Sequence, residues 1–459
     1  MPTAPIVTTR FVELASTTAY KKGIPHLRIS YTPHPITDVP ADICRQYLEG
    51  NDPHTGKPLL EEIISAITKP LAPEDTKRGF VKREPRPKFL PADTEDNLQQ
   101  YFMDKNFTDG GPVILPTKER VARMLEGTSH DPEEIVGTMR PSPPHEAWEY
   151  NVEMVAVNAV MAGAKPEYFP VILAIASTGT SSLFSSTSSF ARMVVVNGPI
   201  VEEIGMNPGI GAMGPFNQAN TTIGRAWTFI SKNLGGSGKP GETFLGTLGN
   251  PLSYDNMCFP ENEAALPKGW KPFHVQKGFK KSDSVVSIFS GWSYNNIAWY
   301  SKLKNEDVMK NWLTHFFSFG TSAATFMIDP VTAEQIRGHG FDSKEKLADY
   351  LAKNSGTPAW LYWQRREKQI EMGKEGKEPY ASYLKLGPNA VIPESRYIRR
   401  PRAKRGTGDT RTESGRAFTR DTIDAENSIE ILVVGGSTNT YWGGGDFSYM
   451  SSALVDKWR

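Results

Sequence analysis

The chain has 459 residues, and its 52 Lys and Arg residues nearly balance its 51 Asp and Glu residues, which leaves a formal net charge of +1. This balance argues against nucleic-acid and membrane-surface partners, and the most apolar window, residues 168–176, is too short to span a bilayer. The N-terminus lacks the apolar core of a secretory signal, so we expect a cytoplasmic globular protein. Cys44 and Cys258 are far apart and predict neither a disulfide framework nor a cysteine-rich metal site.

Residues 1–95 are predicted to form an N-terminal arm with two helices and a linker. The helices should begin near Pro40 and near Pro58, because a proline is favoured at a helix start and apolar residues then recur at helical spacing. The segment from residue 69 to residue 95 is rich in proline and charge, with little apolar periodicity, which is typical of a linker. We therefore expect a short helical N-terminal segment beside the main body of the protein.

Residues 96–395 are predicted to form the main α/β domain, with a mixed or mostly parallel sheet flanked by helices. A helix is expected from His145 to Met161, and it would place Glu146 and Glu149 on one face beside His145. Carboxylates and a histidine on one face could bind a metal ion. The alternative is a solvated acidic face near a helix N-terminus, where acidic residues are favoured anyway. We assign no residue as a metal ligand, and the sequence specifies neither a bound metal nor a cofactor.

The central stretch of the chain runs from a buried strand at Met193–Val196 through a glycine loop, residues 205–214, into a helix. The loop has four glycines in ten residues. A strand, a glycine loop and a helix N-terminus together present backbone N–H groups to an anionic or carbonyl ligand. The alternative is ordinary turn chemistry, which needs the same residue types. The stretch spells G-x-G-x-x-G, but Pro208 precedes it in a loop rather than at a strand end, so a dinucleotide site is not predicted. The substrate-binding groups expected here are Asn197, Gly198, Asn207, Gly209, Gly211, Asn220, Thr222 and Arg225.

Three residues after the central stretch carry candidate chemistry. Glu261 and Glu263 follow a short strand and could act as a general acid or base. His274, which is expected in a strand, could assist, because histidine titrates near neutral pH, although a single histidine is more often structural. Cys258 precedes the two carboxylates, which would raise its pKa and disfavour a reactive thiolate. We therefore predict Glu261, Glu263 and His274 as catalytic residues.

The C-terminal part divides into a basic loop, residues 396–425, and a segment, residues 426–459, that completes the main domain with a strand, a glycine-rich loop and a helix. Gly435, Gly436 and Asn439 follow the strand and are further substrate-binding candidates. Two glycine loops that follow two strands predict one site between them, at the carboxyl edge of an α/β sheet. The basic loop could bind phosphates or an acidic partner, or it could be solvated.

Several segments resemble a little-characterised bacterial family associated with UGSC-motif proteins, small proteins with a Cys-or-selenocysteine-Gly-Ser-Cys motif. The resemblance is carried by residues 109–117, 158–163, 196–200, 205–225, 259–263 and 434–436. It implies that the thiol or selenol chemistry is supplied by a separate partner protein, because this chain has no Cys-Gly-Ser-Cys motif. The chain departs from the pattern at Ala164, where a cysteine is expected, and at Thr332, where a histidine is expected.

These observations favour an enzyme, or the substrate-binding large subunit of a two-component enzyme, that cleaves or eliminates a C–X bond, including C–S bonds, in a small organic substrate. Such an enzyme would be a lyase or a reductase-type subunit, in a homo- or hetero-oligomer. One alternative is a non-catalytic scaffold that binds a thiol or selenol protein. Another is a metal-dependent hydrolase or hydratase that uses His145, Glu146, Glu149 and Glu261.

Overall fold

The computed structural model of the chain describes most of the sequence in eleven stretches, and every structural statement below concerns them. The described residues are 3–21, 23–73, 75–76, 88–139, 148–183, 187–241, 243–298, 303–316, 323–364, 366–398 and 427–459. Most of the predicted basic loop lies outside them, as do His145 and Glu146.

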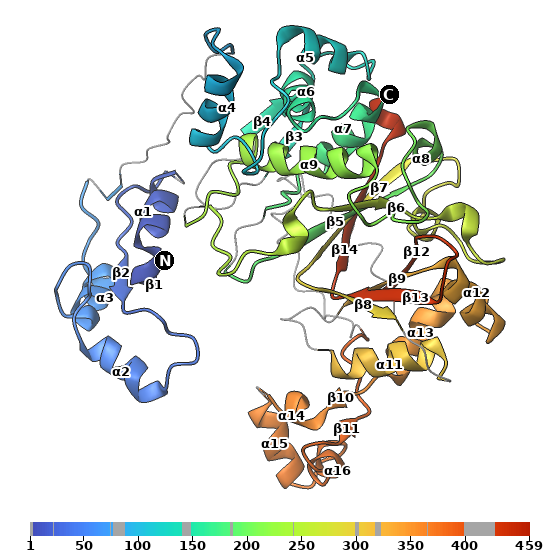
Figure 1. Ribbon diagram of the computed structural model, residues 1–459. Coiled ribbons are helices and arrows are strands. Elements are labelled where there is room, and N and C mark those ends of the chain that lie inside the picture. The colour runs from blue at the N-terminus through green and yellow to red at the C-terminus, as the bar shows by residue number, and fades with distance from the viewer. Residues whose placement is uncertain are drawn as a thin grey trace.

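The N-terminal arm contains a short parallel strand pair and three helices (Figure 1). Its elements are β1 (Ile6–Thr8), α1 (Val12–Lys21), β2 (Ser30–Thr32), α2 (Ala41–Glu49) and α3 (Leu59–Thr68). The helices α2 and α3 begin directly after Pro40 and Pro58, which confirms the two helix starts that the sequence predicted. Asp52 organises the turn between them, because its buried carboxylate accepts hydrogen bonds from the backbone N–H groups of Tyr31, His54 and Thr55.

Two four-stranded mixed sheets form the centre of the molecule (Figure 1). The first has the order β14 (Ser448–Leu454), β7 (Val285–Gly291), β5 (Ala191–Asn197), β6 (Met257–Pro260). The second has the order β12 (Ile429–Val433), β9 (Ala324–Ile328), β13 (Tyr441–Gly445), β8 (Tyr294–Ala298). In each sheet one pair of strands is parallel and the remaining pairs are antiparallel. The predicted α/β class with a mixed sheet and flanking helices is confirmed, but the strands form two sheets.

The side chains of alternate strand residues divide between three hydrophobic cores. In β5, Val194 and Val196 belong to the core under the helices, whereas Met193 and Val195 belong to a different core. That second core also takes residues from β9 and β12, so it lies between the two sheets. Because successive strand side chains point to opposite faces, a strand buried on both sides reads as a continuous apolar run. The result is four layers, with helices outside both sheets.

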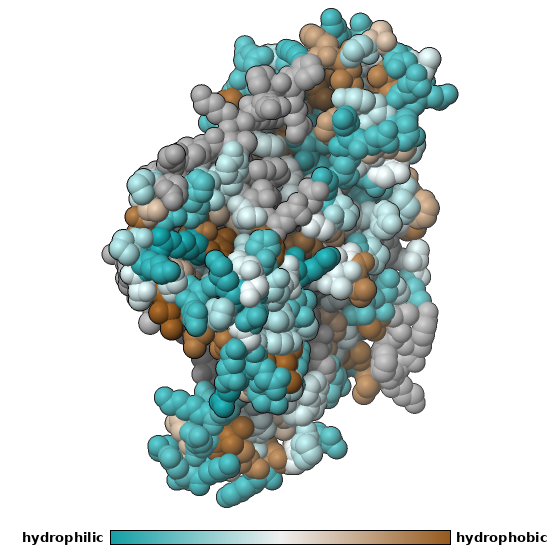
Figure 2. Space-filling model, turned by 90° about the vertical axis from the view of Figure 1, so that its left-hand side faces the viewer, coloured by the Kyte–Doolittle hydropathy of each residue, from teal (hydrophilic) through white to brown (hydrophobic). Residues whose placement is uncertain are grey.

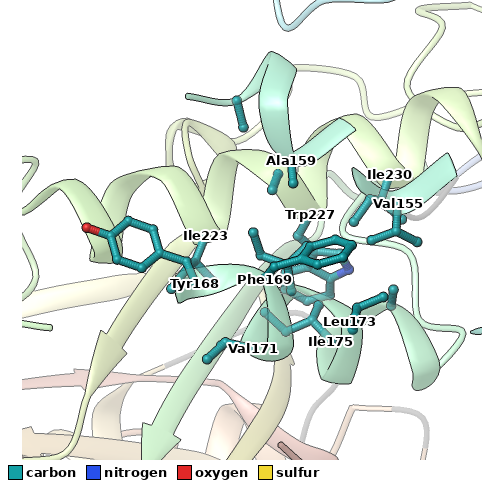
Figure 3. Close-up of a cluster of buried hydrophobic side chains, with 14 of the residues drawn as sticks. Val155, Ala159, Tyr168, Phe169, Val171, Leu173, Ile175, Ile223, Trp227 and Ile230 are labelled. Atoms are coloured by element: carbon teal, nitrogen blue, oxygen red, sulfur yellow. The ribbon is translucent and has the colours of Figure 1, made fainter. Parts of the chain in front are cut away.

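Helices cover the outer face of each sheet. The first sheet is covered by α6 (Val152–Met161), α7 (Phe169–Ser177) and α9 (Gln218–Asn233). Figure 3 shows how the side chains of α9, Trp227 among them, face Phe169 and Leu173 of α7. The second sheet is covered by α11 (Asn305–His315), α12 (Pro330–Gly338) and α13 (Lys344–Asn354).

The remaining described elements are short. They are α4 (Glu95–Asp104), α5 (Lys118–Leu125), β3 (Ile135–Met139), β4 (Trp148–Asn151), α8 (Ile200–Glu203), α10 (Phe273–Gln276), β10 (Thr357–Pro358), α14 (Ala359–Tyr362), α15 (Glu367–Lys374), α16 (Tyr380–Leu384) and β11 (Val391–Ile392).

The two sheets are built from two successive halves with the same topology. The first half runs β5, β6, β7, β8, and the second runs β9, β12, β13, β14. In each half the first two strands pair in parallel and the third lies antiparallel to the first. The fourth strand of each half then crosses over, so that β8 pairs with β13 and β14 pairs with β7. The halves therefore exchange their last strands.

The two crossing segments touch so closely that each needs a glycine. A Cβ atom on Gly291 would lie 2.9 Å from Cα of Phe447, and one on Gly445 would lie 2.6 Å from the backbone oxygen of Ser293. The buried carboxylate of Asp446 joins the segments, because Oδ1 accepts hydrogen bonds from the backbone N–H groups of Trp292 and Ser293, both at 2.9 Å. Glycine is required here for close backbone approach rather than for an unusual φ.

Three local predictions were wrong for physical reasons. The predicted helix 145–161 begins only at Val152, because the Asn151 side chain caps it by accepting from the N–H of Met154, and the preceding β4 pairs with β3. The expected C-terminal helix is the strand β14, since its residues complete the first sheet beside β7. His274 lies in the short helix α10 rather than in a strand.

We predict that Gly445→Ala lowers the free energy of unfolding by about 2–3 kcal/mol, because its methyl group would overlap the backbone of the crossing segment. Chemical denaturation would measure the change. Gly338→Ala is the matched control, since a Cβ atom there meets nothing within 4 Å, and its effect should stay within about 1 kcal/mol. Equal effects at the two positions would contradict the account of the crossing.

Candidate functional site

The carboxyl ends of strands from both sheets meet at one place in the structure. Glu261 and Asn262 directly follow β6 of the first sheet. The backbone N–H of Asn262 donates to the oxygen of Val433, at the end of β12 in the second sheet, at 2.8 Å. The Asn262 side chain donates to the oxygen of Gly435 at 2.9 Å, and the N–H of Gly435 donates to the oxygen of Pro208 at 2.8 Å. The glycine loop and the Gly435–Gly436 turn are thus adjacent, as expected for two loops around one site.

Glu261 is buried, with 1% of its surface exposed, and both of its carboxylate oxygens are occupied. Oε1 pairs with the Lys344 ammonium and accepts from the N–H of Val433 at 3.2 Å. Oε2 accepts from Nδ2 of Asn197 at 3.0 Å and from the N–H of Phe273 at 2.6 Å. A carboxylate with four donors from four elements of the fold is a structural hub, and it has no oxygen left for a substrate.

Lys344 is the partner that the sequence did not reveal. It follows the Ser343 cap, in a segment with the Lys/Glu spacing of an exposed helix, yet only 1% of its surface is exposed. A lysine in the first turn of a helix is unfavourable for the helix dipole, and the nearby Glu261 carboxylate offsets that cost. The position of this lysine, where an acidic residue is usual, was the one available signal in the sequence.

Glu263 is the carboxylate of the site that retains contact with solvent, with 22% of its side-chain surface exposed. Its Oε1 atom accepts hydrogen bonds from Nδ2 of Asn197 and from the backbone N–H of Gly198, both at 2.8 Å. Gly198 has a φ of +89°, and a Cβ atom there would lie 2.1 Å from the backbone oxygen of Asp283. The strand end therefore fixes one oxygen of Glu263, and a glycine is needed to do so.

His274 lies behind Glu263 and is fully buried. Its Nδ1 atom is 3.6 Å from Oε1 of Glu263, which is within ion-pair range but just beyond hydrogen-bond distance. Within the described residues, neither ring nitrogen has a hydrogen-bond partner, and neither does Oδ1 of Asn197. Buried polar atoms without partners are uncommon in proteins and often indicate a functional group or a bound molecule. Glu261 and Glu263 thus share the amide of Asn197, and His274 lies beside Glu263.

The predicted loop residues Asn207, Gly209 and Asn220 hold the glycine loop in shape. Asn207 accepts from the N–H of Gly209 at 2.9 Å, and its own N–H donates to Oδ1 of Asn220 at 3.1 Å. Asn220 also donates to the backbone oxygens of Asn207 and Ala212. Gly211 adopts a φ of +77°, which a side chain would disfavour. These contacts order the loop, and whether its residues also bind a substrate stays a prediction.

Arg225 and Thr222 are engaged elsewhere in the structure. Arg225 forms a bidentate ion pair with Asp109, at 2.7 and 3.0 Å, and donates to the oxygen of Pro112. Burial would raise the pKa of Asp109, but the hydrogen bond and charge of Arg225 outweigh it and lower the pKa overall. The Thr222 hydroxyl donates to the oxygen of Gln218 one turn earlier. Arg225 therefore connects the middle of α9 to the segment 109–112, and Thr222 is bonded within the first turns of the helix.

The C-terminal candidates differ in their positions. Gly435 has a φ of +91° and lies beside Asn262, and Gly436 packs against Ile210 of the glycine loop so closely that a Cβ atom would lie 2.2 Å from that side chain. Asn439 lies further along the loop, is exposed, and accepts from the N–H of Thr440 at 2.9 Å. The two glycines belong to the gathered loops, while Asn439 lies on the exposed part of the turn.

The metal alternative gains no support from the described residues. Among them there is no group of three or more His, Cys, Asp or Glu residues that could hold a metal ion. Glu149 is exposed on β4, and both oxygens of Glu261 are occupied by donors from the protein. The predicted partners His145 and Glu146 lie outside the described residues.

A family model matches the N-terminal part of the chain. The model of the UGSC family matches residues 1–53, which comprise β1, α1, β2 and α2 of the N-terminal arm, and this match supports the resemblance to a UGSC-associated family. The matched residues precede the candidate site, so the match does not bear on its chemistry. No curated protein and no solved structure matches the chain. None of the described helices has both the length and the apolar character needed to cross a membrane.

We predict that Lys344→Met lowers the free energy of unfolding by about 3–5 kcal/mol, because it leaves the Glu261 charge buried without its counter-ion. Thermal and denaturant unfolding would measure the loss. Lys346→Met is the control, since Lys346 pairs with Asp342 in an exposed position and should contribute less than about 1 kcal/mol. A Lys344→Met variant as stable as the control would contradict the role of the pair.

Cys258 should not react with alkylating reagents in the folded protein. Burial raises the pKa of Cys258 to about 12, so at pH 8 its thiol stays protonated, and the side chain is also inaccessible. Treatment with iodoacetamide followed by peptide mass spectrometry should find label on the half-buried Cys44 and none on Cys258. Both cysteines should be labelled in guanidinium. Labelling of Cys258 in the native protein would contradict the prediction.

Proposed function

We propose that the protein is an enzyme, or the substrate-binding large subunit of one, in which Glu263 transfers a proton during cleavage or elimination of a C–X bond in a small organic substrate. The observation that supports this proposal most directly is the unequal environment of two neighbouring carboxylates. Glu261 is buried and fully bonded, whereas Glu263 has one fixed oxygen and remains partly exposed. Different environments for paired titratable groups are characteristic of acid–base sites.

In the proposed reaction, Glu263 removes a proton from carbon. The electron pair of that C–H bond forms a double bond, and the C–X bond breaks with its electrons leaving on X. Asn197 and Gly198 orient Glu263 through Oε1, so the carboxylate needs little reorganisation before it reacts. His274, whose Nδ1 atom is 3.6 Å from Oε1 of Glu263, is a positioning residue that is too deeply buried to contact the substrate.

The second candidate function is a scaffold that binds a separate thiol or selenol protein. The glycine loop supports this alternative, because Ile210 within it and Phe216 just after it have 72% and 83% of their surfaces exposed, next to the site. Exposed apolar side chains beside a polar site are typical of protein contacts. The two functions are compatible if the partner supplies the reactive sulfur or selenium.

We predict that Glu263→Gln lowers turnover at least about a hundredfold, because the amide cannot accept the proton. The assay would follow release of the leaving group from a panel of small substrates that bear hydroxyl, halide or thiol groups β to an acidic C–H. Glu202→Gln, an exposed carboxylate on the neighbouring α8, is the control and should retain activity. His274→Asn should lower kcat more than it changes KM, because His274 is buried behind Glu263 and does not contact the substrate. Full activity of Glu263→Gln would exclude Glu263 as the proton carrier.

A further inference from the structure

The helix α3 in the N-terminal arm has apolar residues on its outward face as well as on its inner face. Leu59 at its start is fully buried, but Leu60, Ile64 and Ile67 are 52%, 52% and 43% exposed, and Leu71 just beyond the helix is 64% exposed. Figure 2 views the molecule from the side on which the arm lies and shows hydrophobic residues on that surface. An amphipathic helix normally buries its apolar stripe, so this face is incomplete in a single chain.

The inner side of α3 is held firmly in place. It packs against α2 and β2, and its N-terminal end is anchored by the Asp52 turn, with the N–H of Leu59 donating to the oxygen of Gly50. Arg28 holds the opposite end by donating to the backbone oxygens of Lys69 and Pro70 and pairing with Asp75. The outward face therefore cannot turn inward without breaking these contacts, and it is preorganised for a partner.

The spacing of the exposed residues identifies the shape of that partner. Positions 60, 64 and 67 follow one another at intervals of four and three, which is the spacing of a coiled-coil seam, and Leu71 extends the apolar surface beyond the end of the helix. Such a seam is complementary to a second helix of the same kind. Glu61 at the start of α3 and Lys69 directly after its end are both exposed, so two copies in antiparallel orientation would bring opposite charges together at both ends.

We infer that α3 is a self-association surface, on which α3 of a second copy of this chain packs antiparallel across a two-fold axis. A two-fold axis gives each copy the same contacts, so one apolar stripe serves both sides of the interface. Antiparallel helices also place the N-terminal end of one dipole beside the C-terminal end of the other. The inference rests on the arm alone and is independent of the proposed chemistry of Glu263.

The test is sedimentation equilibrium of the full chain across a range of concentrations. The wild-type protein should dimerise, and Ile64→Glu should raise the dimer dissociation constant at least about a hundredfold, since each interface contains two copies of the change. Leu248→Glu is the matched control, because Leu248 is a 95% exposed leucine outside the arm, and its dimer should be unaffected. Circular dichroism would establish that both variants are folded.

The orientation has its own test. Glu61→Lys and Lys69→Glu should each weaken the dimer, and the double variant Glu61→Lys/Lys69→Glu should regain most of the loss, because an antiparallel pair joins the two positions. A wild-type monomer at every concentration would overturn the inference, and so would a dimer that Ile64→Glu leaves intact or that Leu248→Glu disrupts equally. Failure of the double variant to recover would overturn the antiparallel arrangement.

Discussion

The rest of the structure depends on the interactions of the buried Glu261 carboxylate with its four donors. It receives a donor from the end of β5, one from α10, one from β12 in the other sheet, and the ammonium of Lys344 from α13. Removing two charges from water is costly, and their mutual attraction offsets that cost only when the geometry is good and the remaining lone pairs are satisfied. Here they are satisfied by three N–H groups, so a single side chain fixes the relative position of both sheets.

The bonds that Glu261 makes also determine the environment of Glu263. Asn197 donates through one nitrogen to Glu261 and to Glu263, so the structural carboxylate and the proposed proton carrier are held by the same amide. In the second half of the fold, β9 corresponds to β5, and Asp329 directly follows it. The Asp329 carboxylate caps a helix, because it accepts hydrogen bonds from the N–H groups of Val331 and Thr332, and it also accepts from the N–H of Tyr441. The two halves therefore share a topology but differ at this strand end. Asn197 belongs to a cluster of polar side chains, whereas Asp329 caps a helix.

The sequence predicted local features well and long-range ones poorly. The strand at Met193–Val196 and the helix after the glycine loop were confirmed, because each depends on nearby residues. The approach of the two glycine loops also agrees with the prediction. Lys344 was missed, since its partner is 83 residues away in the chain and its local pattern indicates an exposed helix. The second sheet was missed as well, because apolar strands do not reveal which neighbours they will pair with.

The exchange of the last strands determines the order in which the chain can become structured. Ser287 of β7 bonds Ser452 of β14 across 165 residues, so the first sheet stays incomplete until nearly the whole chain has been synthesised. Contacts of such long sequence separation form late and slow folding. During synthesis the edge of β7 would be unpaired, which exposes it to aggregation and makes the nascent protein a candidate for chaperone assistance. A chain truncated before β14 would retain the whole first half of the fold, but the first sheet would lack its edge strand beside β7.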